Sequence, residues 1–247
     1  MQQAVRASAT GTMTHLAWNC RGSGGSLRSS TMAHLSRLLV YTRAQVCFIS
    51  ETRNSSITKT SITNHFNLND AFVVPAQGQS GGLWLMWNNE VDITVIDHNH
   101  NFIFALCINK TSMRQYGLVC IYGDPHHRTT RAIWEQVLDF VEQNSNLPMF
   151  CMGDMNNLMH VNEKLGPTRA DVNRINEFCA YVKQCGFIDL GYSGPAYTWT
   201  NKRFSSIPTY ERLDRCLGNA EWCMTYPATT IYHLPMMYSD HAPILAV

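Results

Sequence analysis

Short apolar segments, each a few residues long, recur along most of the chain and are separated by polar or glycine-containing stretches. Segments of this length predict strands, because a strand that is buried on one or both faces spans only a few residues. The predicted strands are His15–Cys20, Val46–Ile49, Ala71–Val74, Gly82–Trp87, Val91–Asp97, Phe102–Ile108, Tyr116–Tyr122, Met149–Met152 and Tyr197–Thr200.

Helical spacing of apolar residues is confined to a few stretches. Apolar residues three and four positions apart lie on one face of a helix, as Met32, Leu35 and Leu39 do here. Gly186 provides a left-handed terminator for the last of these stretches. Strands and helices together predict a mixed α/β fold. The predicted helices are Ser30–Tyr41, Thr130–Gln143 and Val172–Gln184.

The order of the strands predicts parts of the topology. The segments between Gly82 and Tyr122 are typical of an antiparallel meander, with turns at Asn88–Asn89 and His98–Asn101. No repeat, linker or low-complexity stretch divides the chain. We therefore expect a flexible N-terminus over residues 1–13 and one domain over residues 14–247.

Two glycine-containing segments need separate interpretation. Gln79–Gly82 lacks the Lys-Ser/Thr pair and the following helix of a phosphate-binding loop, so it predicts the entry to an edge strand or a β-bulge. Gly153–Ala170 is a polar loop rich in asparagine and glycine. Loops of this kind often carry functional side chains.

Composition indicates a packed globular protein, with 45% hydrophobic and 15% charged residues. The formal net charge of +1 excludes the strongly basic surface of a protein that coats nucleic acid. Any contact with a polyanion must therefore be local. Residues 1–50 contain five arginines, no lysine and no acidic residue, which hints at one basic face.

The nine cysteines include no CxxC pair and no Cys/His spacing suited to a zinc finger. Reduced thiols in the nucleus or the cytoplasm are the simplest interpretation. No apolar run reaches the roughly 18 residues that a membrane span needs, so we expect no membrane contact. The acid-free N-terminus leaves an organellar transit peptide as an alternative.

A carboxylate and an amide follow the strand that ends near Gly153. Side chains two positions apart point to the same side of an extended chain, so Asp154 and Asn156 can address one target. Such a pair suits phosphate hydrolysis, because the carboxylate can deprotonate a water while the amide donates a hydrogen bond without adding repulsive charge. An Asx turn that only closes the strand explains this segment equally well.

Near the C-terminus, Asp240 and His241 precede Pro243 and a strand-like tail, Ile244–Val247. A turn before the proline brings both side chains into one cleft. A histidine held there by a distant carboxylate serves as an acid, a base or a transition-state stabiliser near neutral pH. The alternative is a loop cap without chemistry.

Asn19 and Glu51 each stand where a short hydrophobic strand ends, and one predicted helix separates the two strands. A β-α-β unit places two such strand ends side by side. Together with Asp240, these residues form an oxygen-ligand set for Mg²⁺ or Mn²⁺, which favour carboxylate and amide oxygens over thiolates. A lone glutamate at a strand exit more often faces water.

Eight motifs follow one another between Trp18 and Val247: WNCRG, ISET, SGGLWLMW, IYGDPHHR, GDMNN, AYTWTN, ERLDR and SDHAPI. As an ordered set, they resemble the endonuclease/exonuclease/phosphatase superfamily. Within it, the apurinic/apyrimidinic-type endonuclease domain of plant LINE retrotransposons is the most similar. The resemblance implies a DNase I-like α/β (α+β) fold, a four-layer sandwich in which helices flank two packed mixed β-sheets.

The resemblance also implies a metal site. Glu51 and Asp240 resemble the metal-binding carboxylates of the family, and Asn19 resembles the asparagine that supports the metal and the phosphate. The cofactor implied is Mg²⁺ or Mn²⁺.

Further residues match positions around the phosphate. Asp154 and Asn156 resemble the pair that activates the attacking water and holds the phosphoryl oxygen. His241 is similar to the histidine that stabilises the phosphate, and Asp214 to the aspartate that orients this histidine. Tyr122 resembles the tyrosine that lines the phosphate pocket.

The contacts with nucleic acid follow the same resemblance. Thr198 and Trp199 match the region that contacts the DNA strand, although Trp199 suits a core position equally well. After Tyr122, many relatives have Pro-Asn or a nearby histidine, whereas here either His126 or His127 approaches the scissile phosphate. The basic side chains in or beside the motifs that are available for phosphates are Arg21, Arg128, Arg131, Arg203 and Arg212.

The function expected is metal-dependent nicking of DNA by a monomer. A reverse transcriptase is a further candidate partner, which this sequence does not encode. One alternative is a phosphatase of the same superfamily acting on a phosphoinositide or nucleotide, although Trp199 and the RLDR motif favour nucleic acid. Another is a non-catalytic nucleic-acid-binding relic of a mobile element, against which the intact Glu51, Asp154, Asp240 and His241 argue.

Overall fold

The computed structural model describes residues 13–22, 26–78, 81–202 and 207–247. Residues 1–12 of the predicted flexible N-terminus lie outside the described residues. Met13, the last residue of that predicted segment, is buried in the core.

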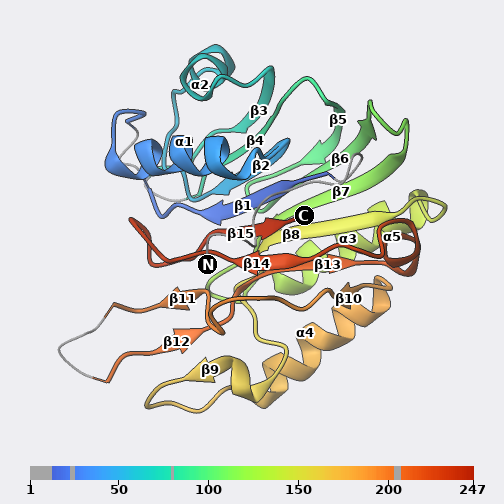
Figure 1. Ribbon diagram of the computed structural model, residues 1–247. Helices are drawn as coiled ribbons and strands as arrows, with labels where there is room; N and C mark the ends of the chain where they lie inside the picture. The colour runs from blue at the N-terminus through green and yellow to red at the C-terminus, as the bar shows by residue number, and fades with distance from the viewer. Residues whose placement is uncertain (1–12, 23–25, 79–80, 203–206) are drawn as a thin grey trace.

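The described chain contains both helices and strands (Figure 1). The helices are α1 (Ser30–Thr42), α2 (Lys59–Phe66), α3 (Thr130–Gln143), α4 (Val172–Gln184) and α5 (Ala220–Thr225), with the 3-10 helix η1 (Val161–Glu163). The strands are β1 (His15–Asn19), β2 (Val46–Ser50), β3 (Asp70–Val74), β4 (Leu83–Trp87), β5 (Val91–His98), β6 (Phe102–Asn109), β7 (Gln115–Tyr122), β8 (Met149–Asp154), β9 (Lys164–Leu165), β10 (Ile188–Asp189), β11 (Trp199–Thr200), β12 (Tyr210–Glu211), β13 (Asp214–Gly218), β14 (Ile231–His233) and β15 (Ile244–Ala246).

Side-chain caps explain where two of the predicted helices begin. The Ser29 side chain accepts a hydrogen bond from the backbone N–H of Met32 at the start of α1. The Asp171 side chain does the same for two backbone N–H groups of α4. The three predicted helices are confirmed, and α1 extends one residue beyond its prediction to Thr42.

In the described part of the chain, two six-stranded sheets and one three-stranded sheet form. The first sheet has the order β14-β15-β1-β2-β4-β3, and the second has the order β10-β13-β8-β7-β6-β5. Each six-stranded sheet contains a parallel central pair, β1–β2 or β7–β8, among antiparallel neighbours. The β1-α1-β2 unit predicted from Asn19 and Glu51 is therefore present.

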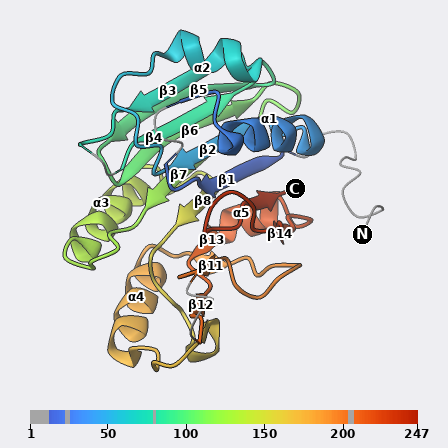
Figure 2. The same ribbon diagram turned by 90° about the vertical axis from the view of Figure 1, so that its left-hand side faces the viewer.

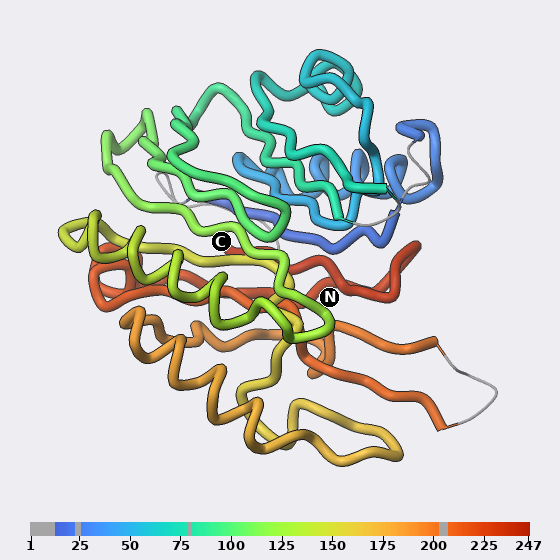
Figure 3. Tube along the Cα trace, turned by 180° about the vertical axis from the view of Figure 1, so that it is seen from behind, coloured from blue at the N-terminus to red at the C-terminus, as the bar shows by residue number. Residues whose placement is uncertain are grey.

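The core is divided into three layers of side chains. Inner faces of both sheets meet in one cluster that includes Phe48, Leu118 and Phe150. The outer face of the first sheet packs against α1 and α2, and that of the second sheet against α3 and α4. The two helix pairs lie on opposite sides of the stacked sheets, as Figures 2 and 3 show. The predicted four-layer sandwich is confirmed.

The predicted four-stranded meander is only partly correct. β5, β6 and β7 pair antiparallel in the second sheet, with a turn at His98–Asn101 as predicted. β4 belongs instead to the first sheet, between β2 and β3, so Asn88–Asn89 lies where the chain crosses between sheets. All five β4 residues are buried, since β4 is an internal strand covered on both faces. The edge strand predicted after Gln79–Gly82 is therefore wrong, and Gln79 and Ser80 lie outside the described residues.

Two sequence expectations concern the state of the cysteines and the presence of membrane-spanning helices. All nine cysteines are free, and Cys20, Cys47, Cys107, Cys120 and Cys151 are buried within or beside strands. Across the described residues, every helix is too short or too polar to span a membrane.

Candidate active site

Asp154 lies at the end of β8, between two neighbouring strands that each contribute a site residue. In the sheet register, Asp154 pairs with Tyr122 of β7 on one side and with Asp214 of β13 on the other. Gly153 has a φ of 136°, and a Cβ there would lie 2.1 Å from the carbonyl oxygen of Ile121. Only glycine fits this close approach of β7, which fixes the register of Asp154.

The Asp154 carboxylate accepts hydrogen bonds from two asparagines. Nδ2 of Asn19 lies 2.9 Å from Oδ2 of Asp154, and the backbone N–H of Asn156 donates to Oδ1 at 2.9 Å. Nδ2 of Asn156 donates to the Gly123 carbonyl at 2.7 Å and lies 3.3 Å from Oδ2 of Asp154. Asn156 adopts a φ of 49°, so the Asx turn is present and also brings its amide back to the carboxylate.

Burial raises the pKa of Asp154 to about 6, although His241 and the asparagine donors act in the opposite direction. Only 1% of the residue is exposed. A carboxylate with a raised pKa binds a proton more readily than an exposed aspartate. Asp154 is therefore suited to accept a proton near neutral pH.

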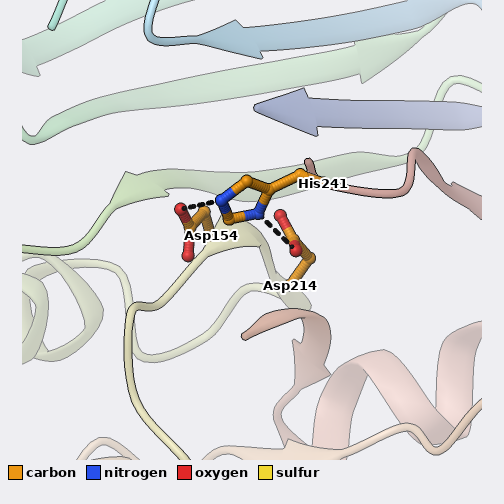
Figure 4. Close-up of side chains that lie close together, drawn as sticks. All are labelled: Asp154, Asp214 and His241. Carbon is orange, nitrogen blue, oxygen red and sulfur yellow. Dashed lines mark hydrogen bonds and ion pairs between the residues drawn. The ribbon is translucent and has the colours of Figure 1, made fainter. Parts of the chain in front are cut away.

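His241 lies between two carboxylates, as Figure 4 shows. Its Nδ1 is 2.9 Å from Oδ2 of Asp214, and its Nε2 is 3.7 Å from Oδ2 of Asp154. Burial opposes the charged form, but Asp214 and Asp154 together raise the pKa of His241 to about 9. The imidazole is therefore protonated at neutral pH.

Backbone contacts fix the position of this pair. The Thr198 hydroxyl accepts hydrogen bonds from the backbone N–H groups of Leu213 and Asp214. The Thr198 carbonyl accepts one from Ala242, next to His241. The side chain of Thr198 is fully buried, so it cannot contact a bound DNA strand as the sequence suggested. It holds Asp214 in place instead.

Glu51 follows β2 and is held by three donors. Oε1 accepts from the Tyr122 hydroxyl at 2.8 Å and from Nδ2 of Asn19 at 3.3 Å, and Oε2 pairs with Arg53 at 3.1 Å. Burial alone would raise the pKa of Glu51, but these hydrogen bonds lower it below its ordinary value. Glu51 is therefore ionised, and Asn19 joins it to Asp154.

Asp240 is also buried and ion-paired. Its Oδ2 pairs with Arg21 and accepts a hydrogen bond of 3.1 Å from the Trp199 indole. The neighbouring Ser239 hydroxyl donates to the backbone carbonyl of Asn19 at 2.8 Å, which joins this segment to β1. Asn19 thus contacts Glu51 through its side chain and Ser239, the residue before Asp240, through its carbonyl, so the two carboxylates belong to the same end of the molecule.

The donor set beside Asn19 fits a hard divalent cation, because Glu51 and Asp240 supply carboxylate oxygens and no thiol. Within the described residues, a different group, Asp154, Asp214 and His241, has ligand atoms within 4.8 Å of one another. This group does not fit a metal, because each ring nitrogen of His241 faces a carboxylate and a protonated imidazole offers no lone pair.

Two arginines of the RLDR motif form a buried ion network next to the site. Arg212 and Arg215 both pair with Glu163 and with Asp189 at 2.8–2.9 Å. Arg215 also donates to the carbonyl of Asn157, in the loop after Asp154. Arg212 was expected to be available for DNA phosphates, but it is 5% exposed and both of its terminal nitrogens bind carboxylates, so that expectation is wrong.

We expect Glu163→Gln to lower the free energy of unfolding by about 3 kcal/mol, because it leaves one buried guanidinium charge uncompensated. Urea denaturation followed by circular dichroism measures this change. The matched control is Glu142→Gln, at an exposed position of α3. Equal stability of the two variants would contradict the prediction.

The remaining residues expected to contact DNA are exposed or partly exposed where the structure describes them. His126 and Arg128 are exposed, and their backbone N–H groups donate to the Asp124 carboxylate. Arg131 is exposed but pairs with Glu135. Arg203 lies outside the described residues. Trp199 is partly exposed, and its ring borders a hollow that Lys164, Thr168 and Thr209 also line.

Some site contacts had little signal in the sequence. Arg53 and Glu163 contact predicted site residues or their supports, yet each is an ordinary polar residue when read along the chain, whereas Ser239 belongs to the SDHAPI motif. The position of Arg53 two residues after Glu51, matching Arg21 two residues after Asn19, is the one regularity that could have indicated it.

Solved structures share this architecture. AP endonuclease LMAP from Leishmania major superposes with a TM-score of 0.75 at 14% identity, covering 95% of this chain and 86% of its own. The endonuclease domain of TRAS1, a telomere-specific non-LTR retrotransposon, gives 0.69 at 14% identity, with 95% and 97% covered. The 3' phosphatase NExo from Neisseria, bound to product DNA hairpin, gives 0.66 at 14% identity, with 96% and 99% covered.

No curated protein sequence matches the chain significantly. The structural likenesses, all at low identity, show the fold. The family follows from a sequence-family model that matches residues 16–241, which include Asn19, Glu51, Asp154, Asp214 and His241. The chain belongs to the endonuclease/exonuclease/phosphatase family.

Proposed function

We propose that this protein is a divalent-metal-dependent phosphodiesterase that nicks DNA, of the LINE retrotransposon type. The observation that carries the proposal is the hydrogen-bonded chain from Glu51 through Asn19 to Asp154, and from His241 to Asp214. It joins a metal-suited carboxylate, a proton acceptor and a cationic donor at one end of two stacked sheets. The TRAS1 endonuclease domain, of which this chain covers 97%, supports the retrotransposon assignment.

In the proposed reaction, Asp154 accepts the proton of the attacking water. Its two asparagine neighbours donate hydrogen bonds to the carboxylate, so they orient it while leaving it ionised. Asn156 can reach a phosphoryl oxygen by exchanging its bond to the Gly123 carbonyl. The amide then stabilises the charge that develops on that oxygen.

His241 supplies positive charge to the phosphate. Asp214 holds Nδ1, so the Nε2–H of the imidazolium is directed away from Asp214 towards Asp154. A phosphate oxygen bound at this edge receives a charge-assisted hydrogen bond, which strengthens as the pentacoordinate transition state forms. A divalent cation held by Glu51 and Asp240 would supply the remaining positive charge and favour departure of the leaving oxygen.

Partners and cofactor follow from this site. DNA is the proposed substrate, with Trp199, His126, Arg128 and Arg21 at the rim to contact its strands. Mg²⁺ or Mn²⁺ is the proposed metal, and the active form is proposed to be a monomer.

We expect Mg²⁺ to support conversion of supercoiled plasmid to the nicked circle, and a chelator to reduce it to background. The physical reason is that removal of the cation leaves the carboxylates to repel the phosphate. Gel electrophoresis of the plasmid measures the nicked fraction, and readdition of Mg²⁺ after chelation is the control. Nicking that persists in the chelator would contradict the metal requirement.

The same purified protein can be used to test the phosphatase alternative. This alternative needs a test because NExo, which shares the fold, is a 3' phosphatase. Phosphate release is measured from a 3'-phosphorylated oligonucleotide, a nucleotide and a phosphoinositide. Release from any of these without plasmid nicking would replace the proposed function with the phosphatase function.

A further inference from the structure

Two arginines lie just beyond the ends of the parallel strands β1 and β2. Arg21 comes two residues after Asn19, and Arg53 comes two residues after Glu51. Both have left-handed backbones, with φ of 44° and 52°. Backbone hydrogen bonds fix both turns, since Arg21 donates to the Asn19 side chain and Arg53 donates to the carbonyl of Gly81.

Each of these arginines pairs with one of the two carboxylates that suit a metal. Arg21 pairs with Asp240, and Arg53 pairs with Glu51 at 3.1 Å. The carboxylate side chains are 4% and 16% exposed, whereas those of Arg21 and Arg53 are 50% and 38% exposed. The guanidinium groups therefore lie on the solvent side of their partners and can leave without disturbing the core.

The Arg53 side chain packs against Gly22, the residue that follows Arg21. A Cβ at position 22 would lie 2.4 Å from Cδ of Arg53, so glycine is needed there to admit the arginine. A guanidinium has five N–H donors, and the carboxylate contacts use only some of them. The other donors are available for phosphates, because the Arg21 and Arg53 side chains are 50% and 38% exposed.

The charges of the site explain why the arginines are present before a cation binds. Four carboxylates, Glu51, Asp154, Asp214 and Asp240, face the imidazolium of His241 and the two guanidinium groups. The guanidinium groups offset negative charge that would otherwise be uncompensated in the empty site, and an entering divalent cation can take over that role.

We propose that Arg21 and Arg53 are resident counterions of Asp240 and Glu51, which an entering divalent cation displaces and which then pair with the phosphates of bound DNA. This inference rests on the proposed function. It predicts that removing either guanidinium charge strengthens metal binding, because the entering cation no longer has to displace a like charge.

The test is Mn²⁺ binding to the 247-residue chain without DNA, measured by electron paramagnetic resonance of free Mn²⁺ and by calorimetry. We expect one ion per wild-type chain. Arg21→Gln and Arg53→Gln should each bind it roughly three- to tenfold more tightly. Arg21→Lys keeps the charge and should bind as wild type does, and Arg37→Gln, on the exposed face of α1, controls for net charge.

Unchanged or weaker Mn²⁺ binding in both glutamine variants would overturn the inference, as would equal effects of Arg21→Gln and Arg21→Lys. Thermal unfolding of each variant shows that the fold is retained. The Glu51→Gln variant distinguishes a failure of this inference from a failure of the proposed function, because it removes a proposed metal ligand. If the wild type binds no Mn²⁺, or if Glu51→Gln does not weaken binding, the proposed metal site itself is wrong.

Discussion

Asp154→Asn is expected to reduce plasmid nicking by about 10³-fold, because it removes the group that accepts the proton of the attacking water. The amide keeps the shape of the carboxylate and its place between β7 and β13. The measurement is the initial rate of nicking at saturating Mg²⁺. The control is Asp139→Asn, at an exposed position of α3, which should nick at the wild-type rate.

The same substitution is expected to stabilise the fold. Burial raises the pKa of Asp154, so the folded state disfavours the ionised form at neutral pH, and a neutral amide removes that cost. A higher thermal unfolding midpoint together with lost nicking would distinguish a catalytic group from a structural one. Loss of both stability and activity would show that Asp154 mainly supports the fold.

The fold was predictable where packing imposes a period on the sequence. α3 was found because Ile133, Val137, Leu138 and Val141 recur at helical spacing, and Ile133 and Val137 are buried in the structure. α2 was missed because only Ile62 and Phe66 are buried in it, which is too sparse to mark a helical face.

The sheet to which a strand belongs was harder to predict. Three residues connect β4 to β5, a length that suits a hairpin as well as a crossing between sheets. The continuous burial of β4 favours an internal strand. The local sequence pattern does not show which strands lie next to it. The meander was therefore predicted one strand too long.

For the site, the sequence predicted that Asn19 and Glu51 lie beside each other, because parallel strands end at the same edge of a sheet. It could not show which partner each side chain takes. Thr198 was expected to face DNA, yet its hydroxyl is used by the backbone of β13. Arg212 was expected to bind phosphate, yet two carboxylates distant in sequence surround it. Such pairings depend on the packed structure.

Nicking is expected to depend on pH as a bell-shaped curve, with an acid limb near pH 6 and an alkaline limb near pH 9. Below the acid limb, Asp154, whose pKa is raised by burial, is protonated and cannot accept a proton from water. Above the alkaline limb, His241 loses the proton that Asp214 and Asp154 hold on it against the effect of burial, so the phosphate loses a cationic donor. Initial rates between pH 5 and pH 10 at fixed ionic strength measure both limbs.

Asp214→Asn assigns the alkaline limb to His241. Removing the carboxylate at 2.9 Å from Nδ1 lowers the pKa of the imidazole, so the alkaline limb should move by about one pH unit or more towards lower pH. The rate at the optimum should fall roughly 100-fold, because the imidazolium is less populated and less well oriented. The acid limb should stay near its wild-type position or move lower, since the Asp214 charge helps to raise the pKa of Asp154. An alkaline limb that coincides with that of the wild type would mean that a group other than His241 controls it, and the role proposed for the Asp214–His241 pair would be lost.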